Sequence, residues 1–470
     1  MHDNNEHALP VAVLGAGPVG LAAAAHLIER GMRPLVLETG AAVGANLASY
    51  RHVRLFSPWQ YNVDKAARRL LREHGWQAPA DTVLPTAGEL LADYLAPLGA
   101  VPAIAASLRL GHRVASITRL GFDKVRTRGR EGAPFLIHAE TADGPRRYLA
   151  SAVIDATGTW SHPNPLGADG IAALGETALA ARIDYGMPNV LGEARARFAG
   201  KRVLVVGAGH SAAGTLLALA RLAEEHPGTA IVWATRGSRL ARVFGGGAAD
   251  GLQARGELGM RLRTLRDTGG LELHQNFRIE EVREVDGRIR VRGEALGGVT
   301  PVIDGIDRIV CAAGARPDLA LTRELRVRHD PWLESTDALA PLIDPNEHSC
   351  GTVRPHGHRE LAHPEPGYYA VGAKSYGRAP NFLLATGYEQ VRSVAAALAG
   401  DMAAADDVQL DLPETGVCNT RLVYEDAPAA AVSCCGVPAA AAASCCTPTP
   451  APAADGACGC ATPASSACCA

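Results

Sequence analysis

The sequence lacks several features that would each point to a particular class of protein. No apolar run approaches the roughly 20 residues that span a bilayer, and the start MHDNNEHALP lacks the basic-then-apolar pattern of a signal peptide. The formal net charge of −3 provides no basic field for nucleic acid or an anionic membrane. Only Cys311 and Cys350 of the eleven cysteines precede residue 418, which excludes a disulfide scaffold spread through the chain. We therefore expect a cytoplasmic protein that binds neither nucleic acid nor membrane.

Two segments of the chain share one layout. Each begins with an apolar strand, a glycine-rich turn, a helix and a second strand, and the turns lie at Gly15 and Gly207. Short alternating strands follow, namely RVASITRL, KVRTR and PFLIHAE in the first segment and RIEEVREV and RIRVRGE, around the Asp286–Gly287 turn, in the second. An apolar strand ending at Gly158 or Gly314 closes each segment. The layout predicts an α/β fold with two Rossmann-like domains.

The first turn, GAGPVG, has the glycine spacing of a dinucleotide-binding site. Gly15 permits the tight turn, Gly17 lets a pyrophosphate approach the backbone, and Gly20 allows close helix packing. Glu38 ends the second strand, where an acid accepts hydrogen bonds from ribose hydroxyls. The alternative is an ordinary tight turn between a strand and a helix, and the acid at Glu38 favours the nucleotide site.

The second turn, GAGHSA, differs from the first in an informative way. Gly207 and Gly209 keep the turn, and Ala212 replaces the third glycine. The next strand ends in WATR, so Arg236 stands where the first unit has an acid. An acid would repel the 2′-phosphate of NADP, whereas a guanidinium holds it, so the residues favour NADPH over NADH. The alternative for Arg236 is a solvated surface charge.

The paired layout resembles the large superfamily of flavoproteins with two dinucleotide-binding domains, over about residues 10–400. The resemblance implies that the N-terminal motif holds FAD and that the inserted domain holds NADPH. Gly158 then matches a chain crossing between the domains, and Gly372 matches the position where the chain passes the flavin. The Gly-Asp pair that is frequent there is replaced by Gly372-Ala373-Lys374, so no carboxylate contact is expected.

The same comparison predicts the domain organisation. Residues 8–160 form the first part of the FAD domain, with a helical insertion at about 45–100, and residues 161–312 form the NADPH domain. Residues 313–404 complete the FAD domain. Residues 405–470, here called the tail, are rich in Ala, Pro, Cys, Ser and Thr. Because such a segment buries too little apolar surface to offset its ordering entropy, we expect it to be disordered.

The positions of the cysteines limit which branches of the superfamily the chain can resemble. Disulfide reductases carry a C-x-x-C or C-x-x-x-x-C pair beside the flavin, and this chain has no cysteine before Cys311. GAGHSA, with Ser211, resembles the G-x-G-x-S turn of flavin-containing monooxygenases. Their F-x-G-x-x-x-H signature is absent from the matching region, IDYGMPNVLGEARARFAGKR.

Longer motifs resemble the flavin-binding monooxygenase-like proteins of bacterial arsenic-resistance operons: RHVRLFSPWQYNVD, DATGTWSHPNPLGADG, NEHSCGTVRPHG, KSYGRAPNFLLATGYEQVRS and LPETGVC. The resemblance implies an NADPH-dependent monooxygenase acting on a small molecule or a metalloid such as trivalent arsenic, or on a sulfur compound. Trp59 and Asn62 are candidates to line the flavin face, and the alternative for Trp59 is a core aromatic. A homodimer is compatible with the sequence.

One Gly/Pro-rich stretch concentrates imidazoles and a thiol. Within residues 348–363 stand His348, Cys350, His356, His358 and His363. These groups could ligate zinc or arsenic or act as acids and bases, and Cys350 is our catalytic candidate among them. The spacing fits no standard zinc pattern, so the alternative is a polar loop near the flavin.

The tail carries closely spaced thiols. Neighbouring cysteines make strained disulfides, but their thiolates present two soft donors to a thiophilic ion such as arsenite. Alternatives are low-complexity drift, a metalloid sink beside a weak NADPH oxidase or redox-sensor domain, and a thiol relay that the flavin reduces. The candidate ligands are Cys434, Cys435, Cys445, Cys446, Cys458, Cys460, Cys468 and Cys469.

Overall fold

The computed structural model describes residues 9–245, 247, 253–295, 297–348 and 353–410. Two five-stranded parallel sheets form its framework, and each is accompanied by a three-stranded antiparallel sheet. The predictions for Cys350 and for the tail cysteines lie outside the described residues. Within the described part of the chain, no helix has the length and apolar character needed to cross a membrane.

The first parallel sheet has the strand order β16-β7-β1-β2-β3. Val13 in its central strand pairs with Val36 on one side and with Ile154 on the other. The strands are short, and the central strands β1 and β7 are fully buried, as expected inside a parallel sheet covered on both faces, whereas the edge strand β3 has no buried residue. Their bounds are β1 Val11–Leu14, β2 Pro34–Leu37, β3 Leu108–Arg109, β7 Ala152–Asp155 and β16 Tyr368–Ala370.

The second parallel sheet repeats this arrangement in the order β11-β10-β9-β15-β8. The two sheets obtain one edge strand differently. In the first sheet, the edge strand β16 comes from the chain that follows all strands of the second sheet. In the second sheet, the edge strand β8 comes from the chain that directly precedes β9. The bounds are β8 Ile183–Tyr185, β9 Arg202–Val206, β10 Ala230–Ala234, β11 Glu272–His274 and β15 Arg308–Cys311. Two Rossmann-like units, predicted from the repeated layout, are therefore confirmed.

The antiparallel sheets occupy matching places, between the third and the closing strand of each unit. Asp286 and Gly287 both have positive φ at the predicted hairpin turn between β12 and β13. The sequence reading missed the third strand of each sheet, β6 and β14. The bounds are β4 Arg113–Arg119, β5 Phe135–Thr141, β6 Gly144–Ala150, β12 Ile279–Val285, β13 Arg288–Gly293 and β14 Val302–Ile306.

The strand predicted for KVRTR is wrong, because residues 124–128 form a loop. The Asp123 carboxylate accepts hydrogen bonds from the backbone N–H groups of Val125 and Arg126, at 3.0 Å each, which turns the chain. The Arg326 guanidinium then donates to the carbonyl oxygens of residues 124–126. Side chains therefore make the hydrogen bonds to these backbone groups that a neighbouring strand would otherwise have made.

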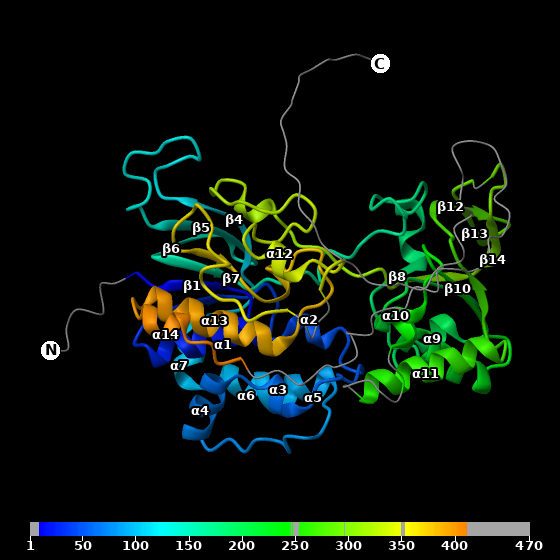
Figure 1. The fold of residues 1–470 in the computed structure, drawn as a ribbon, viewed down its shortest axis with the longest axis horizontal. Helices are drawn as coiled ribbons and strands as arrows, with labels where there is room; N and C mark the ends of the chain where they lie inside the picture. Colours follow the sequence, from blue (N-terminus) through cyan, green and yellow to red (C-terminus); the bar gives the residue numbers. More distant parts are fainter. Residues whose placement is uncertain (1–8, 246, 248–252, 296, 349–352, 411–470) are drawn as a thin grey trace, which may run out of the picture. The chain divides into compact units, whose positions relative to one another are not determined.

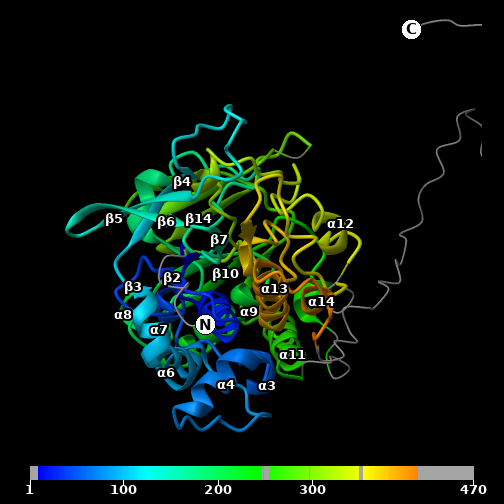
Figure 2. The same cartoon turned by 90° about the vertical axis from the view of Figure 1, so that its left-hand side faces the viewer.

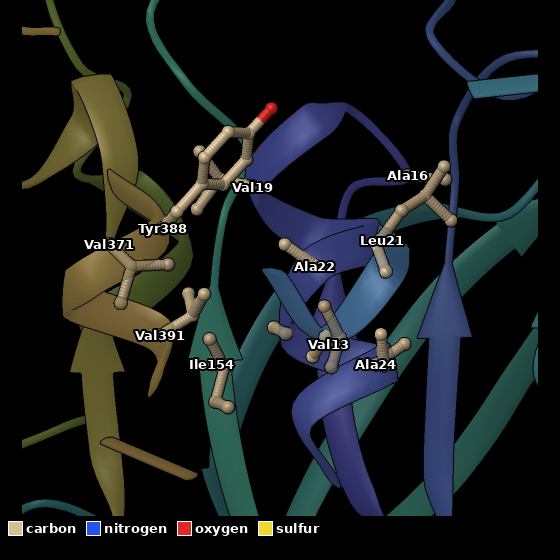
Figure 3. Packing of buried hydrophobic residues seen from close by; sticks show 14 of the residues in the cluster. Val13, Ala16, Val19, Leu21, Ala22, Ala24, Ile154, Val371, Tyr388 and Val391 are labelled. Atoms are coloured by element: carbon tan, nitrogen blue, oxygen red, sulfur yellow. The ribbon is translucent and has the colours of Figure 1, made fainter. Parts of the chain in front are cut away.

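Helix α1 (Pro18–Glu29) lies at the centre of the first unit and buries every residue from Val19 to Leu27. It packs beside α13 (Leu384–Leu398), below the first parallel sheet in Figure 1. Figure 3 shows Val19 of α1 gathered with Tyr388 of α13 and with Ile154 of β7 in one apolar cluster. Helix α13, more than 350 residues after α1 in sequence, thus packs directly on the helix that follows the first glycine-rich turn.

The segment expected to be a helical insertion contains short helices. Asp64 caps α4, accepting from the Ala67 N–H at 2.9 Å, and its other oxygen lies 3.0 Å from Nε2 of buried His26 on α1. Figure 2 shows α4, α6 and α7 together in this region. The bounds are α2 Ala45–Ala48, α3 Trp59–Asn62, α4 Lys65–Glu73, α5 Ala87–Leu90, η1 Leu91–Leu95, α6 Ala96–Ala100 and α7 Pro102–Ser107.

The described chain continues a few residues past the composition change at residue 405. The Arg392 guanidinium donates to the carbonyl oxygens of Ala404 and Asp407, and the Gln409 N–H donates to Glu389. The remaining elements are η2 Thr177–Arg182, α8 Arg195–Phe198, α9 His210–Glu225, α10 Ala241–Phe244, α11 Gln253–Asp267, η4 Ala320–Thr322, α12 Ala340–Ile343, η5 Gly372–Lys374 and α14 Met402–Asp406.

Candidate functional site

The first glycine-rich turn joins β1 to α1 with no room for side chains at two positions. Gly15 has a φ of +92°, a conformation that favours glycine. A Cβ on Gly20 would lie 1.9 Å from the Gly15 carbonyl oxygen. The helix therefore approaches the strand closely, as the sequence predicted from the spacing of these residues.

Gly17 is different, because a Cβ there would meet no protein atom within 4 Å. It is the N-cap of α1, no side chain caps the helix, Pro18 follows at the first helical position, and the first turn carries no acidic residue. The unpaired N–H groups and positive end of the helix dipole therefore face open space beside a glycine. Such a helix end can bind a phosphate.

Glu38 follows β2 and joins the turn. One carboxylate oxygen accepts from the Ala16 N–H at 2.6 Å, and the other accepts from the Gly40 N–H at 2.7 Å. Each oxygen keeps a second acceptor position, because a carboxylate has about four lone-pair sites. The acid predicted to bind ribose hydroxyls is thus fixed in place without using all its acceptors.

The second glycine-rich turn repeats this construction between β9 and α9. A Cβ on Gly207 would lie 2.3 Å from the Ala312 carbonyl oxygen, whereas a Cβ on Gly209 would meet nothing within 4 Å. Gly209 is the N-cap of α9, and no side chain caps that helix. The fully buried Trp233 donates its indole N–H to the Gly207 carbonyl at 2.7 Å and so fixes the turn.

Arg236 lies two residues after the end of β10, and its side chain is exposed. Its guanidinium makes a long 3.3 Å hydrogen bond to the Ala168 carbonyl, which leaves other N–H donors of the fork. Ser211 lies half-buried in the first turn of α9. The predicted NADPH roles of Arg236 and Ser211 remain predictions.

The turn at Gly372 follows β16 and has a φ of +68°. The Gly372 N–H donates to Oε1 of the fully buried Gln390 at 2.7 Å, and Gln390 also donates to the Ser375 hydroxyl and to Nε2 of His356. A buried amide on α13 thus holds the turn that the superfamily resemblance places beside the flavin. Sequence reasoning missed Gln390, since it lies 18 residues away on a helix.

A second buried group joins this turn to the crossing that ends at Gly158. Lys374 donates to Oδ2 of Asp155 at 2.6 Å and to the Thr157 hydroxyl at 3.0 Å. Burial alone would raise the pKa of Asp155, but the Lys374 ammonium and hydrogen bonds from Lys374 and Thr157 hold that pKa below its usual value. Tyr368 donates to the same carboxylate at 3.0 Å. The only sequence signal for this cluster was the missing Gly-Asp pair, in whose place Gly372-Ala373-Lys374 stands.

Trp59 and Asn62, the candidates for the flavin face, both lie in α3 and are buried. Trp59 packs in the apolar cluster that contains α1. The Asn62 amide donates to the Ser57 and Pro58 carbonyls, and the Asn62 carbonyl accepts from the Tyr388 hydroxyl. Both residues therefore have structural contacts, and a contact with a flavin remains a prediction.

The histidines of residues 348–363 do not converge. His348 bonds to the Pro341 carbonyl, His356 to Arg354 and Gln390, and His358 to Ser393, while Nδ1 of His363 accepts from the Arg328 N–H. Among the side chains that the structure describes, no three His, Cys, Asp or Glu residues are grouped to hold a metal ion.

Cys311 is the one cysteine in the described part of the chain, and it is buried at the end of β15. Its thiol donates to the Asn164 carbonyl at 3.5 Å, and burial raises its pKa to about 12. A thiolate is the reactive form of cysteine, so Cys311 is poorly suited to a redox relay.

Comparison with known proteins agrees with the Rossmann-like fold of the two units. Residues 13–77 match the model of an NAD(P)-binding Rossmann-like domain, and no curated protein matches the chain. Bacillithiol disulfide reductase from Bacillus cereus is similar in structure, with a TM-score of 0.62 and 18% identity over 84% of this chain and 99% of that one.

A monooxygenase and an N-hydroxylase are also similar in structure. One is the cadaverine monooxygenase of desferrioxamine biosynthesis from Erwinia amylovora, bound to FAD, with a TM-score of 0.58 and 13% identity over 86% of this chain and 97% of that one. The other is the ornithine N-hydroxylase of Kutzneria sp. 744, with reduced FAD, NADP⁺ and L-ornithine, with a TM-score of 0.54 and 16% identity over 84% and 98%. The chain thus has the fold of oxidoreductases with two dinucleotide-binding domains.

Proposed function

We propose that this chain is an NADPH-dependent FAD oxidoreductase whose first glycine-rich turn holds FAD and whose second holds NADPH. The observation that carries the proposal is the pair of open helix N-termini at Gly17 and Gly209. An acid follows the second strand of the first unit and an arginine follows that of the second, at Glu38 and Arg236. Two phosphate cradles with opposite charges at the sugar position fit two different dinucleotides.

The residues around each cradle suit its cofactor. Glu38 would accept hydrogen bonds from the adenosine ribose of FAD, while the α1 N-terminus would bind the pyrophosphate. Gly158 and Gly372 would let the backbone pass close to the flavin. Arg236 would pair with the 2′-phosphate of NADPH, and Ser211 would lie beside its pyrophosphate. Bound FAD would supply two-electron chemistry, taking hydride from NADPH and passing electrons to an acceptor.

The buried state of Cys311 argues against a dithiol relay in the described part of the chain. A monooxygenase-like reaction, in which oxygen accepts the electrons, is therefore the first candidate. The substrate class that suits the tail cysteines is a thiophilic metalloid, an arsenical, or a reduced sulfur compound. For arsenite the reaction would balance as arsenite, O₂, NADPH and a proton giving arsenate, water and NADP⁺.

The proposal is tested on the purified full-length protein. We expect a yellow protein that contains FAD, oxidises NADPH faster than NADH, and forms one arsenate for each NADPH consumed when arsenite is present. A folded protein that neither retains nor binds FAD contradicts the cofactor assignment. NADPH oxidation that yields hydrogen peroxide and no arsenate contradicts the oxygenation of arsenite.

A second candidate is favoured by the clustered cysteines: the tail sequesters a metalloid or accepts electrons from the flavin. A full-length variant with serine at all nine tail cysteines separates these functions. If the tail captures substrate, the variant should show a higher KM for arsenite and unchanged NADPH oxidation without arsenite. If the tail is the electron acceptor, anaerobic NADPH oxidation by the oxidised protein should fall in the variant to the one equivalent per FAD that the flavin itself consumes.

A further inference from the structure

Two backbone segments that the proposed function places around the flavin are joined by buried charged side chains. One segment is the crossing of residues 155–158, and the other is the turn of residues 372–375. The Asp155 and Lys374 side chains are 0% and 2% exposed, and they are 219 residues apart in sequence. Within the first unit, this ion pair is therefore a direct link between those two segments.

The acceptors of Asp155 are fully used by these two segments and by β16. Oδ2 accepts from Lys374 at 2.6 Å and from the Tyr368 hydroxyl at 3.0 Å. Oδ1 accepts from the Thr157 hydroxyl at 2.7 Å and from its backbone N–H at 3.2 Å. Four donors match the four acceptor positions of a carboxylate, which is the condition for a buried ion pair to be stable.

A buried ion pair is not needed for stability as such, because replacing it by apolar side chains of similar volume often leaves stability unchanged. Stability alone therefore does not require charges here. The chain lacks the Gly-Asp pair that is frequent at Gly372, and Lys374 lies two residues later with its ammonium directed to Asp155 and Thr157.

We propose that Lys374 is a positioning residue for the flavin, acting through Asp155 and Thr157. The bonds of Lys374 fix the spacing between the crossing and the turn, while Gln390 fixes the turn from the side of α13. The inference rests on the proposed function, because it assigns the pair a role only if FAD binds between these segments. It adds residues that neither the glycine motif nor the arginine pattern identifies.

The test compares Lys374→Met, Asp155→Asn and the double variant by FAD titration of the apoprotein and by thermal unfolding. If the pair acts as one unit, each single change should weaken FAD binding by at least about 30-fold, and the double variant should be no weaker than the singles. The midpoint potential of any bound flavin should also shift. Losses that add in the double variant would overturn the proposal.

A matched control separates positioning from general stability. Glu365 is a buried carboxylate of the same unit that pairs with Arg119 and Arg130 and contacts neither segment. Glu365→Gln should lower the unfolding temperature and leave FAD affinity within about threefold. If Glu365→Gln weakens FAD binding as much as Lys374→Met does, the role of Lys374 is structural and the proposal fails.

Thr157→Val provides a variant that should fold even if the charge variants do not. It removes the hydroxyl between Asp155 and Lys374 without unpairing either charge, so FAD affinity should fall about 3- to 10-fold with little change in unfolding temperature. Unchanged affinity and potential would count against the proposal. If wild-type apoprotein itself binds no FAD, the proposed function fails instead, which this first titration reveals.

Discussion

Alanine substitutions at Gly17 and Gly20 should have opposite effects on folding and on cofactor binding. A Cβ on Gly17 meets no protein atom within 4 Å, and its backbone, with φ −79° and ψ −173°, suits alanine. A Cβ on Gly20 would lie 1.9 Å from the Gly15 carbonyl oxygen. The methyl group at position 17 would therefore occupy space open to a ligand, whereas the methyl group at position 20 would collide with the protein backbone.

The magnitudes follow from these distances. Gly17→Ala should leave the apoprotein as stable as wild type or about 0.5 kcal/mol more stable, because alanine reduces the entropy of the unfolded chain. It should weaken FAD binding by about 100-fold, since losing one or two hydrogen bonds to a charged phosphate costs about 3 kcal/mol. Gly20→Ala should cost about 3 kcal/mol or more of folding stability, because backbone must move to admit the methyl group.

The assay is thermal unfolding of each apoprotein by circular dichroism, combined with titration of FAD followed by its fluorescence. Gly214→Ala is the control, because it lies inside α9 with no atom within 4 Å of its Cβ and should affect stability only. Gly209→Ala should raise the KM for NADPH and leave FAD binding intact. If Gly17→Ala binds FAD as tightly as wild type, the phosphate is not held at this helix end.

Three further changes test other parts of the reasoning. Arg236→Glu should lower kcat/KM for NADPH about 10- to 100-fold and spare NADH, since a charge-assisted hydrogen bond contributes about 1.5–3 kcal/mol; an unchanged coenzyme preference in steady-state kinetics would mean that another residue reads the 2′-phosphate. Cys311→Ala should leave the turnover number within about twofold of wild type. A tenfold loss would instead support a thiol relay through Cys311. Burial and repulsion from His329 lower the pKa of His363 to about 4, so neutral His363 stabilises the fold above pH 6.5 and this contribution, about 3 kcal/mol, is lost as the pH falls from 6.5 to 4. His363→Leu should flatten the decline in unfolding temperature over that range, and an unchanged slope would contradict the assignment.

Local chemistry explains which features the sequence could predict. The turns at Gly15 and Gly207 are encoded by residues that are neighbours in the chain, and so is the hairpin at Asp286–Gly287. The loop at residues 124–128 is turned locally by Asp123, but its carbonyl groups are bound by Arg326, which lies some 200 residues away. Long-range partners of this kind change local preference and leave no periodic pattern.

The candidate site shows the same division. Glu38 and Arg236 lie within two residues of the ends of their strands, so their positions could be read from the sequence. The pair of Asp155 with Lys374 and the bond of Gln390 to Gly372 could not, because β7, β16 and α13 must first assemble. The replaced Gly-Asp pair marked the position as unusual, but only the fold shows where the lysine is directed.

The fold is shared with a disulfide reductase, a monooxygenase and an N-hydroxylase, so it does not by itself select the electron acceptor. The selection must come from whichever group reaches the flavin. Cys311 faces the core of the second sheet, with Ile309 and Ala234 in the same cluster, and its thiol is held in the unreactive protonated form. Since the second sheet is the proposed NADPH unit, a thiol there cannot serve as the acceptor without unpacking its own strand. The candidate electron acceptors are therefore oxygen, a bound small molecule, and a cysteine outside the described residues, and product stoichiometry in the presence and absence of oxygen distinguishes oxygen from the other two.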